Sequence, residues 1–245
     1  MRVDFYGNTN MGNVRSRNED NFVLKEVWGA THLLAVAIDG VGGKENGDVA
    51  AELTARCIDN HICGCKPTPN SLEVLQAAVI NANNAIYQQR RGNMSCVLTA
   101  ALLNLETGSL YVAHVGDTRM YMFKDSVLTK VTSDHSIVGS MEESGQITEL
   151  EAMAHPHRNI ITRSVGKEIL QWGTEYIQTH TIKLKPNTTL LLCSDGLYDM
   201  VHSSQTTEIL SESISVDKRV DKLIDAALEA GGKDNVTVIV IDLKK

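Results

Sequence analysis

Acidic residues recur in this chain beside apolar runs that have the length of a buried strand. Six of them lie within two residues of such a run: Glu19, Asp20, Asp39, Asp117, Asp195 and Asp234. An isolated Asp–Gly pair, such as Asp39–Gly40, is ordinarily a turn. Repetition of the pattern at several strand ends indicates instead that the carboxylates meet at one edge of the core, provided that those ends converge.

Carboxylates gathered at one edge repel one another. Two of them about 5 Å apart at an effective dielectric constant of about 20 repel by roughly 3 kcal/mol. Because few basic residues lie nearby in the sequence, protons or divalent cations must supply the opposite charge. Oxygen donors without cysteine, and without histidine at ligand spacing, select hard ions such as Mg²⁺ or Mn²⁺. A carboxylate that bridges two such ions makes a two-metal centre, which activates a water and holds a phosphoryl group.

Arg15 is the cation that would accompany this cluster. A guanidinium fork matches the oxygens of a phosphate in a way that a lysine cannot. Arg15 therefore points to a phosphoester substrate, and the alternative is a surface arginine paired with Glu19.

Other catalytic chemistries lack their motifs. The chain contains no Walker A sequence, no Gly-x-Gly-x-x-Gly, no Gly-x-Ser-x-Gly, and no cysteine followed six residues later by arginine. The scattered histidines are interpreted as surface residues of strands or helices rather than bases: His32, His61, His114, His180 and His202.

Composition limits the class of protein. The chain has 245 residues, 42% of them hydrophobic, with 23 Lys and Arg against 30 Asp and Glu, a net charge of −7. That acidity disfavours nucleic acid and anionic membrane as partners. Five cysteines, an odd number, argue against a disulfide framework. Because the sequence shows neither a signal peptide nor a membrane span, we expect a soluble, cytoplasmic protein.

Strand and helix patterns place the carboxylates in a layered fold. Strand-length runs lie at 21–27, 33–38, 96–104, 110–115, 120–124, 127–131, 181–184, 189–193 and 236–243, and helical spacing at 45–62, 71–90, 203–211 and 216–230. Hairpin-length links, with helices in pairs, favour antiparallel sheets with helices outside them. The pattern weakens over 139–166, where we expect two short helical fragments in an irregular surface excursion. No linker divides the chain, so we expect one domain, 1–245.

The motifs in this order resemble those of the metal-dependent type 2C serine/threonine protein phosphatases, the PPM family, in its compact bacterial form. They are GNVR with NED (12–20), AIDGVGG (37–43), AHVGDTR (113–119), TSDHS (132–136), HP with NIITR (155–163), LLCSDGL (191–197) and GGKDNVT (231–237). The resemblance covers nearly the whole chain, from about residue 9 to residue 243.

The resemblance implies an α+β fold, a sandwich of two antiparallel sheets with helix pairs on both outer faces, and two Mn²⁺ or Mg²⁺ ions at one end. By this resemblance Asp39 bridges both ions, Asp195 and Asp234 hold the first, and the Gly40 carbonyl holds the second, with Asp20 or Glu19 acting through water. Asp117 matches the position that, with Asp195, holds a weaker third ion in bacterial members. Arg15 matches the phosphate-binding arginine.

The resemblance also implies the reaction and the partners. A metal-activated water would attack the phosphorus of phosphoserine or phosphothreonine in proteins, in opposition to a serine/threonine protein kinase, and the protein would be a monomer. Residues 139–166 match the family's flap, which is expected to contact the phosphoprotein. Val41 stands where animal members carry the proposed general acid, so a metal-bound water or His157 would have to protonate the leaving oxygen. Two alternatives are a catalytically silent phosphoprotein-binding module and a hydrolase of small phosphoesters.

Overall fold

A computed structural model describes residues 2–41, 46–68, 70–89 and 94–244 of the chain. Gly42 and Gly43 of the motif 37–43 lie outside the described residues. So do Glu45 and Arg90, where the sequence predicted that one helix begins and another ends.

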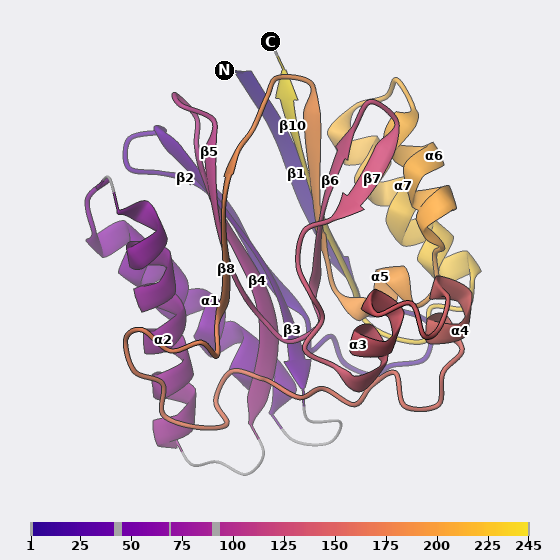
Figure 1. The fold of residues 1–245 in the computed structure, drawn as a ribbon, viewed down its shortest axis with the longest axis horizontal. Helices are drawn as coiled ribbons and strands as arrows, with labels where there is room; N and C mark the ends of the chain where they lie inside the picture. The colour runs from indigo at the N-terminus through magenta and orange to yellow at the C-terminus, as the bar shows by residue number, and fades with distance from the viewer. Residues whose placement is uncertain (1, 42–45, 69, 90–93, 245) are drawn as a thin grey trace.

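Two five-stranded antiparallel sheets form the centre of the molecule (Figure 1). In spatial order the first sheet contains β1 (Arg2–Asn10), β10 (Val236–Lys244), β9 (Thr188–Cys193), β6 (Arg119–Lys124) and β7 (Val127–Lys130). The second contains β2 (Asn21–Val27), β3 (His32–Val41), β4 (Ser95–Asn104), β5 (Ser109–Val115) and β8 (Gln178–Lys183). The predicted α+β sandwich is therefore confirmed.

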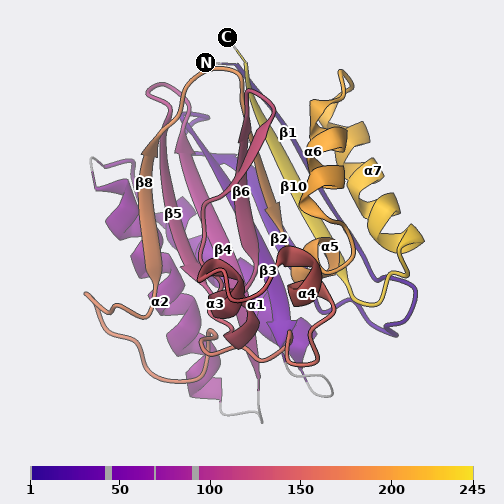
Figure 2. The same cartoon turned by 45° about the vertical axis from the view of Figure 1, so that its right-hand side comes forward.

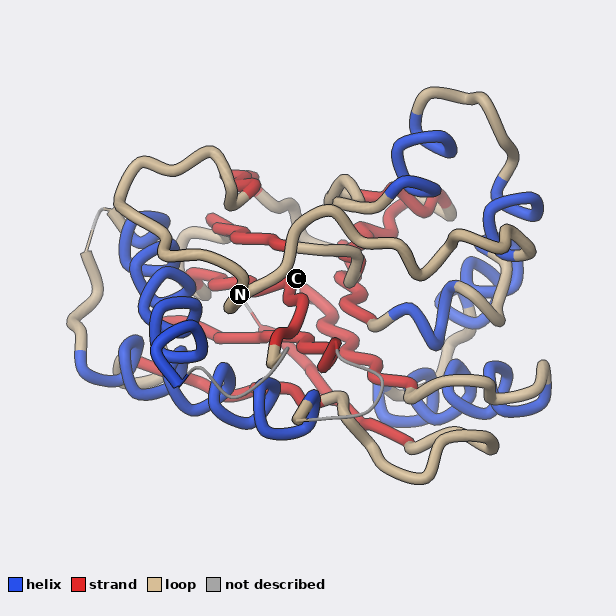
Figure 3. Tube along the Cα trace, turned by 90° about the horizontal axis from the view of Figure 1, so that it is seen from below, coloured by secondary structure: helices blue, strands red, loops and turns tan. Residues whose placement is uncertain are grey.

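Helix pairs cover the two outer faces (Figures 1 and 2). The pair α1 (Gly47–Gly64) and α2 (Ser71–Gln89) packs on the second sheet, and the pair α6 (Ser203–Ser211) and α7 (Val216–Glu229) packs on the first. Seen from below, the strands lie in the middle with helices on both sides (Figure 3). The structure thus has the four layers that the sequence predicted.

The apolar run in β3 is continuous because both faces of the strand are buried. Leu33, Ala35 and Ala37 face the core between the sheets, together with residues of β9 and β10. Leu34, Val36 and Ile38 alternate with them and pack under α1 and α2. Side chains of successive strand residues point to opposite faces, so one strand contributes to two cores.

Antiparallel pairing brings the acidic strand ends together. Asn21, at the start of β2, lies opposite Ile38 near the end of β3, and Val238 of β10 lies opposite Cys193 at the end of β9. Strand β3 does not end at Ile38, as its apolar run suggested: it continues to Val41 because its next residues pair with β4. Both termini lie at the other end of the sandwich (Figure 1).

Three short helices lie at the acidic end (Figures 1 and 2). They are α3 (Ile137–Glu143), α4 (Glu149–Met153) and α5 (Asp195–Tyr198). Two helical fragments were expected within 139–166; α4 lies inside that range, and α3 begins two residues before it. Ser136 caps α3 by accepting from the Gly139 amide, and Thr148 forms a capping box with Glu151 at α4. Within the described part of the chain, no helix combines the length and apolar character that crossing a membrane would require.

Candidate active site

A cavity of about 200 Å³ opens at this end of the sandwich. Seven of the eight predicted site residues line it: Arg15, Glu19, Asp39, Gly40, Asp117, Asp195 and Asp234. They come from the loop after β1, from β3, from the turn after β5, from α5 and from the turn before β10. The structure therefore brings these residues together around one space, whereas Asp20 does not line it.

Gly40 lies against two neighbouring backbone segments. Its amide donates to the Glu19 carbonyl at 3.1 Å. A Cβ atom on Gly40 would stand 2.4 Å from the Gly47 carbonyl oxygen and 2.6 Å from that of Glu19, closer than real Cβ contacts allow. Only glycine fits here, so the backbone next to Asp39 approaches the loop of Glu19 closely.

A second glycine, Gly196, allows the start of α5 to lie close to the turn before β10. Asp195 begins α5, and a Cβ atom on Gly196 would lie 2.0 Å from the Asn235 carbonyl oxygen. The turn that carries Asp195 therefore packs directly on the turn that carries Asp234. This contact explains the glycine of the motif 191–197 in steric terms.

Glu19 and Asp20 have different environments. Glu19 lines the cavity, whereas Asp20 is 9% exposed and lies behind it. The Asp20 carboxylate accepts from the hydroxyls of Ser194 at 2.6 Å and Thr237 at 2.7 Å. Burial raises the pKa of Asp20 to about 7, although the two hydroxyls act in the opposite direction. Of the two acidic residues that the sequence left open, Glu19 is the one that faces the cavity.

Arg15 forms an ion pair with a predicted metal ligand. Its Nη2 lies 2.6 Å from Asp234 Oδ2. The sequence alternative paired Arg15 with Glu19, whereas in the structure its partner is Asp234. Asn235 holds the loop of Arg15 in place: its Nδ2 donates to the carbonyls of Met11 and Arg17, and its Oδ1 accepts from the Glu19 amide, each at 2.8 Å.

Five carboxyl groups and one guanidinium line the cavity. Burial and then repulsion from Asp195 raise the pKa of Asp39 well above its usual range. Burial, followed by repulsion from Asp199 and Asp234, does the same for Asp195. Asp117 has a pKa raised to about 7, again mainly by burial. Carboxylates in this state gain from a bound cation.

The donor set fits a hard cation, with one rearrangement. Carboxylate oxygens and a backbone carbonyl are the ligands of Mg²⁺ and Mn²⁺. As the side chains stand, the described residues contain no group of three His, Cys, Asp or Glu side chains that encloses an ion. Since Asp234 is engaged by Arg15, an ion would have to replace that guanidinium at the carboxylate.

Asn159 and Ile161 reach the cavity from the segment 139–166. The sequence placed them in a motif but gave them no role, because only the fold brings this segment across the strand ends. His157, considered there as a proton donor, is exposed and does not line the cavity.

Two histidines that were expected on the surface are buried. His32 is 4% exposed and His114 is 0% exposed. The His114 ring lies between the Thr99 hydroxyl at 2.9 Å and the Ser133 carbonyl at 3.1 Å. The ring nitrogens of His32 contact the Thr31 hydroxyl at 2.9 Å and Asn104 Nδ2 at 3.1 Å. Such partners satisfy the ring nitrogens and make burial possible, so the surface prediction was wrong for both histidines.

Residues 6–236 match the family model described as Protein phosphatase 2C. The chain belongs to the protein phosphatase 2C family. Among its relatives, the serine/threonine phosphatase stp of Listeria monocytogenes is 32% identical over 250 residues, which cover 99% of this chain and 96% of that protein.

Solved structures of serine/threonine phosphatases have the same fold. Stp1 of Staphylococcus aureus superimposes with a TM-score of 0.89 at 28% identity, covering 100% of this chain and 96% of that one. The catalytic domain of the phosphatase PstP, in complex with two manganese ions, superimposes with a TM-score of 0.83 at 30% identity, covering 99% of each chain. The family resemblance and the fold predicted from the sequence are both confirmed.

Proposed function

We propose that this chain, a serine/threonine phosphatase of the PP2C type, hydrolyses phosphoserine and phosphothreonine in proteins with two Mn²⁺ or Mg²⁺ ions. The observation that carries this proposal is the acidic cavity at the strand ends, which is lined by five of the six predicted carboxylates. The manganese ions of the related PstP domain support the choice of metal.

Each carboxylate has a role in the proposal. Asp39 would bridge the ions, Asp195 and Asp234 would hold the first, and the Gly40 carbonyl with Glu19 would face the second. Asp20 does not line the cavity and would hold the adjacent Glu19 in position through its own hydrogen bonds with Ser194 and Thr237. Asp117 would serve a weaker third ion together with Asp195. Bound there, two ions would supply a nucleophilic water at neutral pH and positive charge for the phosphoryl oxygens.

Arg15 would bind the phosphate. Its guanidinium already lines the cavity, and Asn235 fixes its loop by three hydrogen bonds. Once Asp234 turns to a cation, the fork of Arg15 is released toward two phosphate oxygens. Arg15 would orient the phosphoryl group and stabilise the charge that develops on it.

The segment 139–166 would act as the flap of a single-domain enzyme. Asn159 and Ile161 bring it to the cavity mouth, where a phosphoprotein must pass. We infer that a serine/threonine protein kinase supplies the substrates, that the enzyme is a monomer, and that it works in the cytoplasm. All five cysteines are unpaired, which agrees with a reducing compartment.

Hydrolysis of a phosphothreonine peptide tests the proposal. We expect turnover with Mn²⁺, loss of turnover with a chelator, and loss in Asp39→Asn. Asp225→Asn, an exposed position on α7, is the matched control and should keep full activity. Activity retained with the chelator or in Asp39→Asn would refute the proposal.

Two alternatives predict different results in the same assay. A hydrolase of small phosphoesters would turn over nucleotides or sugar phosphates faster than the peptide. A silent binding module would bind the phosphopeptide and release no phosphate. We expect the peptide to be the preferred substrate, since the cavity is open beside the segment 139–166.

A further inference from the structure

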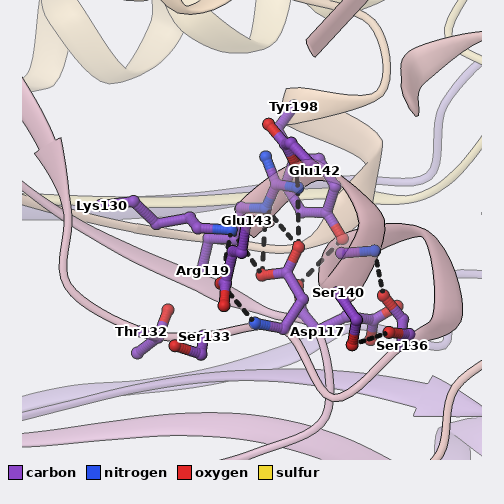
Figure 4. A network of polar contacts seen from close by, with 12 residues as sticks. Asp117, Arg119, Lys130, Thr132, Ser133, Ser136, Ser140, Glu142, Glu143 and Tyr198 are labelled. Atoms are coloured by element: carbon purple, nitrogen blue, oxygen red, sulfur yellow. Dashed lines mark hydrogen bonds and ion pairs between the residues drawn. The ribbon is translucent and has the colours of Figure 1, made fainter. Parts of the chain in front are cut away.

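The Arg119 guanidinium is buried where β6 meets the segment 139–166 (Figure 4). Arg119 opens β6, two residues after Asp117, and its side chain is 7% exposed. Its Nε and Nη2 donate to Asp134 at 3.0 and 2.7 Å, and Nη2 also donates to Glu142 Oε2 at 2.8 Å. Because Glu142 belongs to α3, one planar fork ties β6 to that helix.

The same guanidinium contacts the helix of Asp195. Its central carbon lies 3.7 Å from the ring centroid of Tyr198, the last residue of α5. The Tyr198 hydroxyl in turn donates to the backbone carbonyl of Asp117 at 2.9 Å. Arg119 thus links α3 with two segments that carry cavity carboxylates.

Helix α3 is seated closely on this network. A Cβ atom on Gly139 would lie 2.3 Å from Cβ of Asp134. At the other end of the helix, Glu143 accepts from the Asp134 amide at 3.3 Å and forms an ion pair with Lys130 at 3.0 Å. The position of α3 is therefore set by polar contacts to the sandwich rather than by a large apolar face: among its residues only Val138 and Gly139 are buried.

We propose that Arg119 is a positioning residue which, through Glu142, fixes α3 and, with it, the segment 139–166. Asn159 and Ile161 of that segment line the cavity, and the Ile137 amide of α3 donates to the Ile160 carbonyl at 3.1 Å. The inference rests on the proposed role of that segment as the flap. A phosphopeptide, whose chain must contact the segment, depends on this position, whereas a small aryl phosphate does not. Arg119 itself would touch neither substrate.

Glu142→Ala tests the link with little disturbance. Arg119→Ala would leave the buried Asp134 carboxylate with only Lys130, at 3.5 Å, as an ion-pair partner and would destabilise the whole protein, whereas Glu142 lies at the edge of the network. Alanine is also a better helix former than glutamate, so α3 itself is not weakened. Glu142→Gln keeps an oxygen that can accept from Arg119, and Glu208→Ala, exposed on α6, is the matched control.

We expect Glu142→Ala to raise the KM for a phosphothreonine peptide about fivefold with kcat unchanged within twofold. The kinetics with p-nitrophenyl phosphate should stay the same, and Glu142→Gln and Glu208→Ala should stay within twofold of the wild type on both substrates. An unchanged KM for the peptide would overturn the inference. Equal losses on both substrates would also overturn it, since Glu142 would then act on the chemistry or on folding.

Amide hydrogen exchange without metal gives an independent readout. We expect exchange over 137–143 to be about tenfold faster in Glu142→Ala and unchanged in α1. Unchanged exchange over 137–143 would overturn the anchoring role. If the wild type does not hydrolyse the peptide, the proposed function fails, whereas the exchange result still decides whether Glu142 holds α3.

Discussion

Asn235→Ala should loosen the loop that carries Arg15. Asn235 is 4% exposed, and its amide makes three hydrogen bonds of 2.8 Å, to the carbonyls of Met11 and Arg17 and from the amide of Glu19. A hydrogen bond contributes about 1 kcal/mol net, and a buried group left without a partner costs about 1–3 kcal/mol. We expect the free energy of unfolding to fall by about 3 kcal/mol.

Urea unfolding of the metal-free protein measures this loss, with the slope against urea concentration unchanged. A released Arg15 should also lower kcat/KM for the phosphopeptide by about tenfold or more, because the phosphate is no longer held in line. Asn60→Ala, an exposed amide on α1, is the control and should change stability by less than about 0.5 kcal/mol. A loss of unfolding free energy below about 1 kcal/mol in Asn235→Ala would refute the role of Asn235 in holding the loop of Arg15.

Three further predictions concern backbone packing, pH and a structural ion pair. Gly40→Ala should abolish activity and lower the melting temperature, because its Cβ would stand 2.4 Å from the Gly47 carbonyl oxygen; a fully active variant would contradict this close packing. Burial lowers the pKa of His114 to about 3, so between that value and about 6.5 the unfolded chain binds a proton that the folded one does not, and stability is lost as pH falls. The advantage in unfolding free energy of the wild type over His114→Gln should shrink by about 2 kcal/mol from pH 7.5 to pH 5, and an equal advantage at both pH values would count against it. Asp242→Ala leaves Arg219 buried without its carboxylate and should cost about 3–5 kcal/mol in thermal or urea unfolding; kcat/KM at low temperature should be unchanged, and a specific loss of kcat would argue against a structural role.

The sandwich was predictable because its strands are buried on both faces. A run such as Leu33–Ile38 needs an apolar layer on each face of its strand. The paired helices supply one layer, and the facing sheet supplies the other. The end of β3 was not predictable: Asp39–Gly40 has the composition of a turn, yet pairing with Val97 and Cys96 keeps it in the strand.

The acidic residues around the cavity could be picked out from the sequence, but the hydrogen bonds that fix them and their loops could not. The six acidic positions beside strands could be read from local patterns, because each belongs to its own strand end. The roles of Asp20 and Asn235 depend on partners more than 170 residues away, and no local pattern carries that information. His114 was misjudged because its ring partners Thr99 and Ser133 lie on other segments, 15 and 19 residues away, which only the fold brings to the ring.

Binding of Mn²⁺ measured by calorimetry tests the central claim most directly, because it asks whether the acidic end of the sandwich is a metal centre. We predict two ions per chain with a weaker third, loss of the strong binding in Asp39→Asn, and loss of only the weak ion in Asp117→Asn. The control Asp225→Asn should bind as the wild type does. Equal Mn²⁺ binding by the wild type and Asp39→Asn, or no binding by either, would contradict the account.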